Sequence, residues 1–239
     1  MELQIKYLQR FKTTLNMRRI FVFLILNIMS IGITFSHVNT SNTHVQSLKR
    51  SYKSVCDSGS IEAKKQYFEI FPSTFSEFKD VFGYEETKTD AIFGELYEES
   101  LEYVTAFFRL NEVIDPYSFS KKVIGLCING KWQADGVNYL KANVVNIVTS
   151  DNNHDCYYNY SDFFTCYNDT IRETLLACLA QCSEEEILSF WQFYLDEVAT
   201  ISVDKELFIR TKCIVQKYPV LVEKLEKAYF LSQGKPENN

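Results

Sequence analysis

Four glutamates recur at short spacing near the middle of the chain and form its densest group of side chains able to do chemistry. They are Glu95, Glu98, Glu99 and Glu102. Carboxylates held close together raise one another's pKa, so one of them could act as a general acid or base, or the group could bind a cation. Spacings of three and four residues place them instead on the polar side of a helix. We therefore expect a solvated acidic face that suits partner binding better than catalysis.

Three histidines offer little for metal or nucleophilic chemistry, because His37 and His44 flank a predicted cleavage region and only His154 lies inside the predicted folded body. The triplet His154-Asp155-Cys156 brings three kinds of metal ligand together, but adjacent residues rarely converge on one ion. The sequence contains no CxxC pair, no HExxH, no GxSxG and no glycine-rich phosphate loop. It therefore predicts neither a bound metal nor a cofactor, and it favours a protein that is not an enzyme.

An apolar run near the start of the chain predicts export. Met17-Arg18-Arg19 precedes the run Ile20 to Phe35, and small residues follow at Thr34 and Ser36. This is the three-part pattern of a secretory signal peptide. We predict a signal peptide over 1–36, with Met17 as an alternative start, and a periplasmic, cell-surface or secreted protein. The other interpretation is an uncleaved anchor, although the run is shorter than the roughly 20 residues of a typical spanning helix.

The charge balance indicates the kind of partner to expect. The chain has a formal net charge of −6, and residues 1–36 hold five of its basic residues, so the part beyond them is more acidic still. Negative charge repels nucleic acid and anionic membranes. We therefore expect a basic protein partner, no nucleic acid, and membrane contact only if the leader stays uncleaved.

All seven cysteines lie beyond the predicted signal peptide and would meet an oxidising compartment after export. Cys156 and Cys166 could close a short loop around an aromatic-rich segment as a disulfide. Cys178 and Cys182 lie four residues apart on one helix face, where they would more naturally pair with other helices. Cys127, within an apolar stretch, is expected to be a small buried side chain. An odd count cannot pair completely, and the connectivity does not follow from sequence.

The elements that position these candidates are predicted to be helices. Residues 37–60 are polar and indicate a linker, 61–231 a helical domain, and 232–239 a disordered tail. Apolar residues recur every three to four positions with almost no alternation, which predicts an all-α, irregular bundle of about eight or nine helices. An α-solenoid-like array is the alternative, although no fixed-period repeat supports it. Helices are expected over 61–71, 74–82, 91–110, 116–128, 134–148, 161–180, 187–195, 204–217 and 219–231.

Local signals fix several helix ends. Asp115-Pro116 supplies an N-cap and a first-turn proline, and Ser183 with Glu186 forms a capping box. The longest amphipathic segment is 91–110, where one predicted stripe carries Phe93, Tyr97, Leu101, Val104 and Phe108. Only 144–148, with its β-branched residues, could suit a strand.

Two aromatic groups have different predicted roles. Trp132 lies on a loop between helices and could anchor a partner at the surface. Phe190, Trp191, Phe193 and Tyr194 cover more than one side of a helix, so we expect them to be buried between neighbouring helices.

Three segments carry a resemblance to other proteins. Phe71 to Phe75 continuing to Phe82-Gly83-Tyr84-Glu85, Asn129 to Gly136, and Ser189 to Tyr194 resemble uncharacterised helical proteins of bacteria. The resemblance covers roughly 61–231 and assigns no activity and no functional residue. It implies only a bacterial periplasmic or cell-surface setting.

Together these observations predict an exported helical binding or interaction protein, of the inhibitor or immunity type, that masks a basic partner with acidic helix faces and exposed aromatic residues. The alternative is a hydrolase of envelope material that uses the clustered carboxylates. That alternative requires at least one of Glu95, Glu98, Glu99 and Glu102 to face a concave pocket.

Overall fold

The computed structural model describes residues 43–86, 90–131, 135–149, 169–196 and 205–233. The chain divides into two compact units, Met1–Gln46 and Ser47–Asn239. In the first unit the described residues, 43–46, are helical. Nearly all described residues belong to the second unit. The predicted signal peptide over 1–36 lies outside the described residues, which begin at residue 43.

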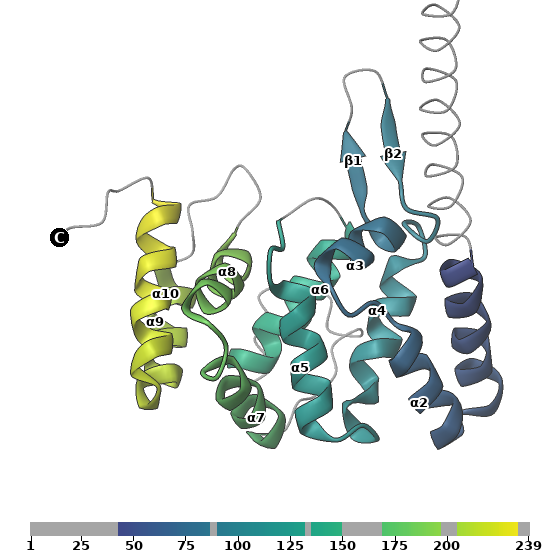
Figure 1. Ribbon diagram of the computed structural model, residues 1–239, viewed down its shortest axis with the longest axis horizontal. Coiled ribbons are helices and arrows are strands. Elements are labelled where there is room, and N and C mark those ends of the chain that lie inside the picture. Colours follow the sequence, from purple (N-terminus) through teal and green to yellow (C-terminus); the bar gives the residue numbers. More distant parts are fainter. Residues whose placement is uncertain (1–42, 87–89, 132–134, 150–168, 197–204, 234–239) are drawn as a thin grey trace, which may run out of the picture. The chain divides into compact units, whose positions relative to one another are not determined.

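The second unit is all-α, a multi-helix bundle, as the apolar spacing predicts (Figure 1). Residues 47–58 are helical, and two 3-10 turns, η1 (Arg109–Glu112) and η2 (Val215–Lys217), interrupt the α-helices. The only strands among the described residues are the short β1 (Tyr84–Glu86) and β2 (Ala91–Phe93). The labelled helices are α2 (Ile61–Ile70), α3 (Phe75–Phe82), α4 (Ser100–Phe108), α5 (Pro116–Cys127), α6 (Asp135–Thr149), α7 (Asp169–Leu179), α8 (Glu184–Leu195), α9 (Lys205–Ile214) and α10 (Pro219–Ser232).

The most extensive helix contacts skip one element along the chain. Helix α4 packs on α6, α5 packs on α7, and α8 packs on α10. Helices that follow one another in sequence therefore share fewer contacts than helices two places apart. Because each pair interlocks with the next, the buried side chains form one continuous interior rather than separate two-helix units.

Phenylalanines from several helices meet in what we call the aromatic core, which comprises Phe68, Phe71, Phe82, Phe107 and Phe119. The rings of Phe71 and Phe107 stack with centroids 4.2 Å apart, and Phe107 also contacts Phe119 at 5.6 Å. Phe107 is fully buried. Aromatic side chains bury large areas and gain further energy from ring contacts, so this cluster is a main source of stability.

Helix N-termini are fixed by side-chain caps, and two of them confirm the sequence predictions. The Asp115 carboxylate accepts a hydrogen bond from the Ser118 backbone N–H at 2.9 Å, which lowers the pKa of Asp115. Ser183 and Glu186 form the predicted capping box, and the hydrogen bond from the Ser183 backbone N–H lowers the pKa of Glu186. Thr74 caps α3 in the same way. Each cap satisfies backbone N–H groups that a helix start leaves unpaired.

A helix terminus is also satisfied by a lysine from a neighbouring helix. Lys122 of α5 donates hydrogen bonds to the carbonyl of Phe68 and, at 2.7 Å, to the carbonyl of Phe71, both at the C-terminal end of α2. Partial burial lowers the pKa of Lys122 to about 8. The ammonium group donates to carbonyls that have no partner within α2, and its positive charge is favourable at the negative end of the helix dipole.

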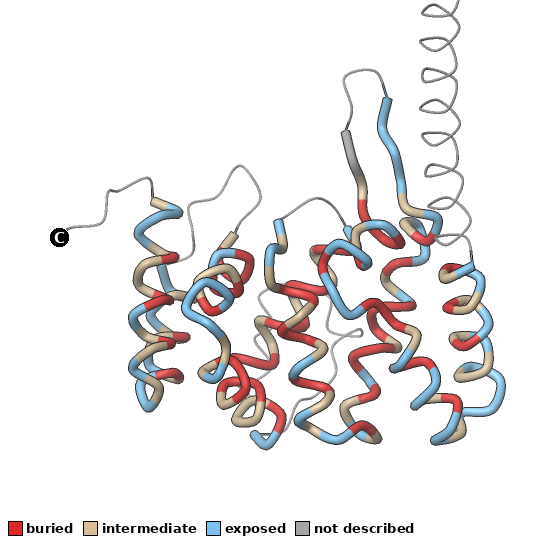
Figure 2. The backbone as a smooth tube through the Cα atoms, viewed as in Figure 1, coloured by how far each residue is buried: buried red, intermediate tan, exposed pale blue. Residues whose placement is uncertain are grey.

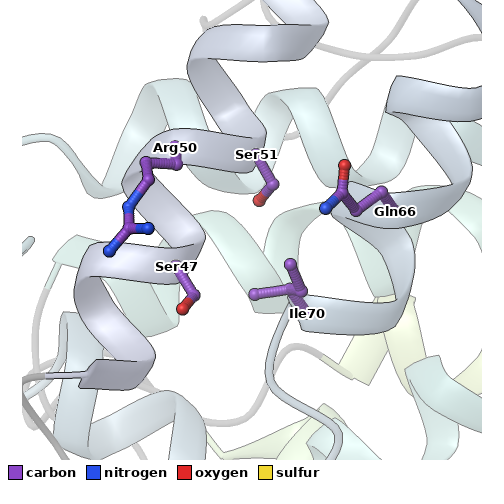
Figure 3. Close-up of a pocket in the computed structure, with 5 residues that line it drawn as sticks. All are labelled: Ser47, Arg50, Ser51, Gln66 and Ile70. Carbon is purple, nitrogen blue, oxygen red and sulfur yellow. The ribbon is translucent and has the colours of Figure 1, made fainter.

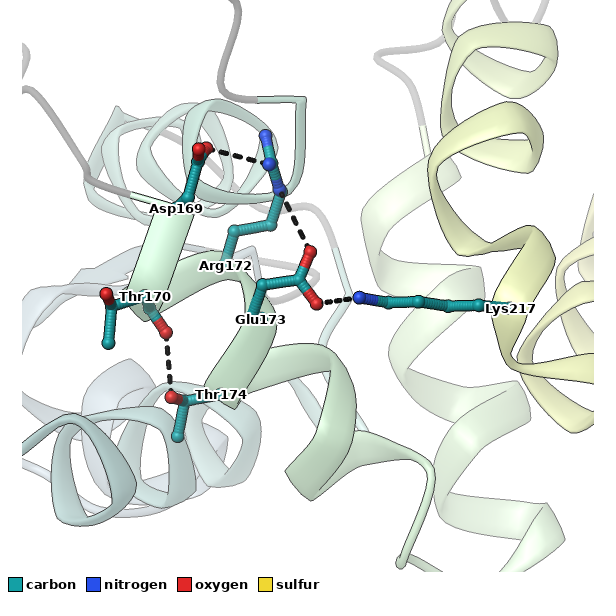
Figure 4. A network of polar contacts seen from close by, with 6 residues as sticks. All are labelled: Asp169, Thr170, Arg172, Glu173, Thr174 and Lys217. Carbon is teal, nitrogen blue, oxygen red and sulfur yellow. Dashed lines mark hydrogen bonds and ion pairs between the residues drawn. The ribbon is translucent and has the colours of Figure 1, made fainter.

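An ion-pair network joins α7 to η2 at the surface (Figure 4). Asp169 contacts Arg172 at 2.7 Å, and Glu173 lies between Arg172 and Lys217 of η2. The acidic partners and Lys217 are well exposed. Exposed pairs contribute little to stability, so the network orients these segments more than it stabilises the fold.

The prediction of one helix over 91–110 is wrong in its first half. Ala91–Phe93 is a strand, and α4 begins only at Ser100. The cause is a close backbone approach: Gly94 N–H donates to the Gly83 carbonyl at 2.9 Å, and a Cβ on Gly94 would lie 2.3 Å from the Val81 oxygen. Phe93 is therefore not part of the core-facing stripe, whereas Val104 and Phe108 of α4 are buried as predicted.

Residues 47–58, which the sequence analysis assigns to a polar linker, are helical in the structure. Leu48 and Ser51 are buried, and the Ser51 hydroxyl donates to the Leu48 carbonyl at 3.0 Å. Tyr52 stacks on Tyr103 of α4 with ring centroids 4.2 Å apart. The compact unit thus starts at Ser47 rather than Ile61. Most residues of this helix are polar, and only a narrow side of it, which includes Leu48 and Ser51, is buried.

The remaining differences are small. Residues 144–148, the stretch whose β-branched content could suit a strand, belong to α6, because Val144, Ile147 and Val148 all fall on its buried side. The helix predicted over 161–180 corresponds to α7, and its residues before Asp169 lie outside the described residues. Phe190, Trp191, Phe193 and Tyr194 are all buried, as predicted.

Candidate partner-binding surface

The β1–β2 hairpin exposes two large apolar side chains. The strands pair antiparallel with Tyr84 opposite Phe93 and Glu85 opposite Ile92, and the hairpin extends away from the helices (Figure 1). Ile92 is 58% and Phe93 is 53% exposed, and β2 is exposed along its whole length (Figure 2). Neighbouring residues of a strand point to opposite faces, so Ile92 lies on one face of the ribbon, and Phe93 lies on the other together with Tyr84.

The exposed phenylalanine is held by neighbouring rings. The Phe93 centroid lies 5.3 Å from that of Tyr84 and 4.9 Å from that of Tyr97. The Tyr97 hydroxyl in turn donates to Asp135 Oδ2 of α6 at 3.3 Å, and burial together with this carboxylate raises the pKa of Tyr97. The Phe93 ring is therefore oriented before any partner arrives, which lowers the entropy cost of binding.

The four predicted carboxylates follow this hairpin along the chain. Glu95 and Glu98 are in the turn after β2, Glu99 is the N-cap residue of α4, and Glu102 is in its first turn. All four are exposed. Glu95 pairs with Lys49 at 2.7 Å, whereas the other three have no cationic partner among the described residues. Negative charge at a helix N-terminus is favourable, so these acids are compatible with the start of α4.

A pocket formed by described residues has none of the four glutamates in its walls. That pocket lies between residues 47–58 and α2, and its walls are formed by Ser47, Arg50, Ser51, Gln66 and Ile70. All four carboxylates are exposed side chains, and none of them faces into this pocket.

The other predicted site residues lie outside the described residues: Trp132, the cysteines Cys156 and Cys166 of the predicted disulfide, and His154. The described cysteines are free thiols, namely Cys56, Cys127, Cys178, Cys182 and Cys213. Cys127 is buried as predicted, and burial raises the pKa of its thiol. Among the described residues no three His, Cys, Asp or Glu side chains gather as metal ligands.

Sequence reasoning missed Ile92 as a surface residue and assigned Phe93 to the core. A signal was present: Thr87-Lys88-Thr89-Asp90 is a short polar stretch between Tyr84-Glu85-Glu86 and Ala91-Ile92-Phe93. Such a stretch between two short runs containing aromatic or β-branched residues is typical of a hairpin. The helical spacing of the residues from Phe93 onward concealed it.

The described helices provide no segment with the length and apolar character needed to cross a bilayer. Comparison with protein-family models, with curated proteins and with solved structures found no match to this chain. The evidence on function therefore comes from the surface of the chain itself, and the hairpin with its neighbouring acids is the most distinctive part of that surface.

Proposed function

We propose that this protein is an exported interaction protein that binds a basic protein partner through the hairpin surface, defined as Ile92, Phe93, Glu95, Glu98, Glu99 and Glu102. One observation carries the proposal. Two apolar side chains, each more than half exposed, lie on the two faces of the hairpin, and four exposed carboxylates follow them along the chain. Three of the four lack a cation among the described residues. Export rests separately on the predicted leader over 1–36.

The two kinds of side chain have complementary roles in such a contact. A large apolar group at the centre of an interface supplies most of the affinity once it is buried in the partner. Surrounding charge supplies orientation and a faster encounter with a partner of opposite sign. Phe93 is the natural anchor because Tyr84 and Tyr97 already fix its ring. The carboxylates select a partner rich in lysine and arginine, and covering that partner's basic site is the action of an inhibitor or immunity protein.

The anchors are tested by quantitative capture from the exported fraction of the producing cell. The double variant Ile92→Ser, Phe93→Ser removes the apolar groups, and Ile209→Ser on α9 is the matched control because Ile209 is 48% exposed and lies on a helix outside the hairpin surface. We expect a basic protein on wild type and on the control, and a loss of at least about tenfold on the double variant. Equal capture by all three proteins contradicts the proposal.

The charges are tested with a triple reversal, Glu98→Lys, Glu99→Lys and Glu102→Lys. Its control reverses three other exposed glutamates that have no ion pair among the described residues, Glu62, Glu112 and Glu185. Both variants have the same net charge, so a general charge effect weakens binding equally in both. We expect the hairpin variant alone to lose the partner, and we expect wild-type binding to weaken with added salt. An acidic partner, or binding that salt leaves unchanged, overturns the proposal.

A further inference from the structure

We propose that the pocket between residues 47–58 and α2 binds a small organic carboxylate. The pocket has a volume of about 200 Å³ and is open to solvent. Ser47, Arg50 and Ser51 come from the first helical segment, and Gln66 and Ile70 come from α2 (Figure 3). The site is separate from the hairpin surface, and the inference does not depend on the proposed function.

Four of the five lining residues have a polar side chain and none is an acid, in a chain whose net charge is −6. Arg50 has no acidic partner among the described residues, so its guanidinium keeps its hydrogen-bonding capacity for a ligand. A guanidinium presents parallel N–H donors that match the two oxygens of a carboxylate. The Gln66 amide supplies a further donor.

Basic residues outnumber acidic ones on the two segments that form the pocket, although Asp57, Glu62 and Glu69 also lie on them. Lys53 from the first segment and Lys64 and Lys65 from α2 form no ion pair among the described residues. Lys49, by contrast, is neutralised by Glu95. This excess of positive charge is small, so Arg50 in the pocket wall is the group that would favour an anionic ligand over a neutral one.

The shape of the lining selects a carboxylate rather than inorganic phosphate. Figure 3 shows Arg50 at one side of the pocket, with Gln66 and Ile70 at the other. A ligand that spans it meets a charged group at one end and an aliphatic wall at the other. Phosphate would leave the Ile70 side chain against a hydrated anion, whereas a short alkyl chain would pack on it.

The test is a titration of the purified protein with sodium butyrate, followed by amide chemical shifts in NMR spectra. We expect saturable shifts at residues 47–58 and in α2. Arg50→Gln should weaken the apparent affinity by about tenfold or more, because it removes a charge-assisted bidentate contact. Lys53→Gln is the matched control, since it removes the same charge from the same segment but from a residue that does not line the pocket. Its affinity should stay within about twofold of wild type.

Three results would overturn the inference. The first is shifts that do not saturate, and the second is equal binding by Arg50→Gln and wild type. The third is phosphate binding as tight as butyrate binding, which would remove the role of Ile70. Arg50 is exposed, so its replacement should leave the fold intact, and the thermal midpoint of each variant verifies this. Should Arg50→Gln fail to fold, Arg50→Lys keeps the charge and removes the paired donors, and it should still weaken butyrate binding.

Discussion

Phe107 and Phe93 come from the same stretch of sequence but have opposite environments. Phe107 is fully buried in the aromatic core, whereas Phe93 is 53% exposed on the hairpin. Both rings touch other aromatic rings, so ring contact alone does not distinguish them. What differs is the exclusion of water around Phe107. The comparison teaches that one aromatic residue holds the fold, and that the other is free to serve a contact outside it.

The largest expected effect is in the aromatic core. Phe107→Ala should lower the free energy of unfolding by about 3 to 5 kcal/mol, because it removes a buried ring and leaves a cavity. Urea denaturation followed by circular dichroism measures this loss. Phe107→Leu is the control, and it should cost clearly less. A loss below about 1 kcal/mol would mean that the core repacks and that the contrast with Phe93 is weaker than the burial suggests.

The buried hydrogen bond between α8 and α9 should give the next largest effect. The Tyr194 hydroxyl and Thr211 Oγ1 lie 2.8 Å apart, and both residues are fully buried. Thr211→Val keeps the shape and leaves the tyrosine hydroxyl unpaired, which should cost about 1 to 3 kcal/mol. Adding Tyr194→Phe should restore part of the loss, because no polar group then lacks a partner. If the two substitutions are additive, the hydrogen bond has no net role.

Substitution of an exposed residue that caps a helix should destabilise the protein less than Phe107→Ala and more than a substitution of Phe93. Ser183→Ala removes the cap of α8 and should cost about 1 kcal/mol in chemical denaturation. Ser76→Ala, at an exposed position inside α3, is the control and should change little. A neutral Ser183→Ala would show that exposed polar groups of this protein are as dispensable for stability as the hairpin side chains.

Charged residues show the same contrast between buried and exposed positions, because Lys122 is partly buried whereas the hairpin glutamates are exposed. The folded chain binds the Lys122 proton less tightly than the unfolded chain, since its pKa is lowered from 10.5 to about 8. Stability should therefore rise with pH between these two values in wild type relative to Lys122→Met. Solvent screening at this partly exposed group should keep the slope below about 1 kcal/mol per pH unit. A difference that falls with pH would contradict the assigned burial.

The smallest effect on stability should come from the hairpin. Phe93→Ser should change the free energy of unfolding by less than about 1 kcal/mol, because about half of the side chain is already in water and its ring contacts lie at the surface. The same variant should lose most partner capture. A large loss of stability would break the comparison, since Phe93 would then belong to the fold after all.

The features that sequence predicted correctly are local. The Asp115 and Ser183 caps join residues three apart, so their residue types alone reveal them. The apolar spacing of α5, α6 and α8 likewise predicts a buried side from neighbouring residues. The carboxylates were identified as an exposed group, although three of the four precede α4 rather than lie along a helix face.

The features that sequence missed depend on distant contacts. The hairpin exists because Gly94 approaches Gly83 and Val81, a contact that the helical spacing of 93–108 gives no reason to expect. The helix over 47–58 is stabilised by Tyr52 packing on Tyr103 of α4. Neither partner is visible in a local window, so propensity and spacing were overridden by tertiary packing.

The pairing of α8 with α10 has a consequence for how the chain matures. During synthesis α8 is translated before α10, so the surface of α8 that α10 covers has no partner until α10 follows. The native packing of α8 therefore cannot be completed before α10 is available.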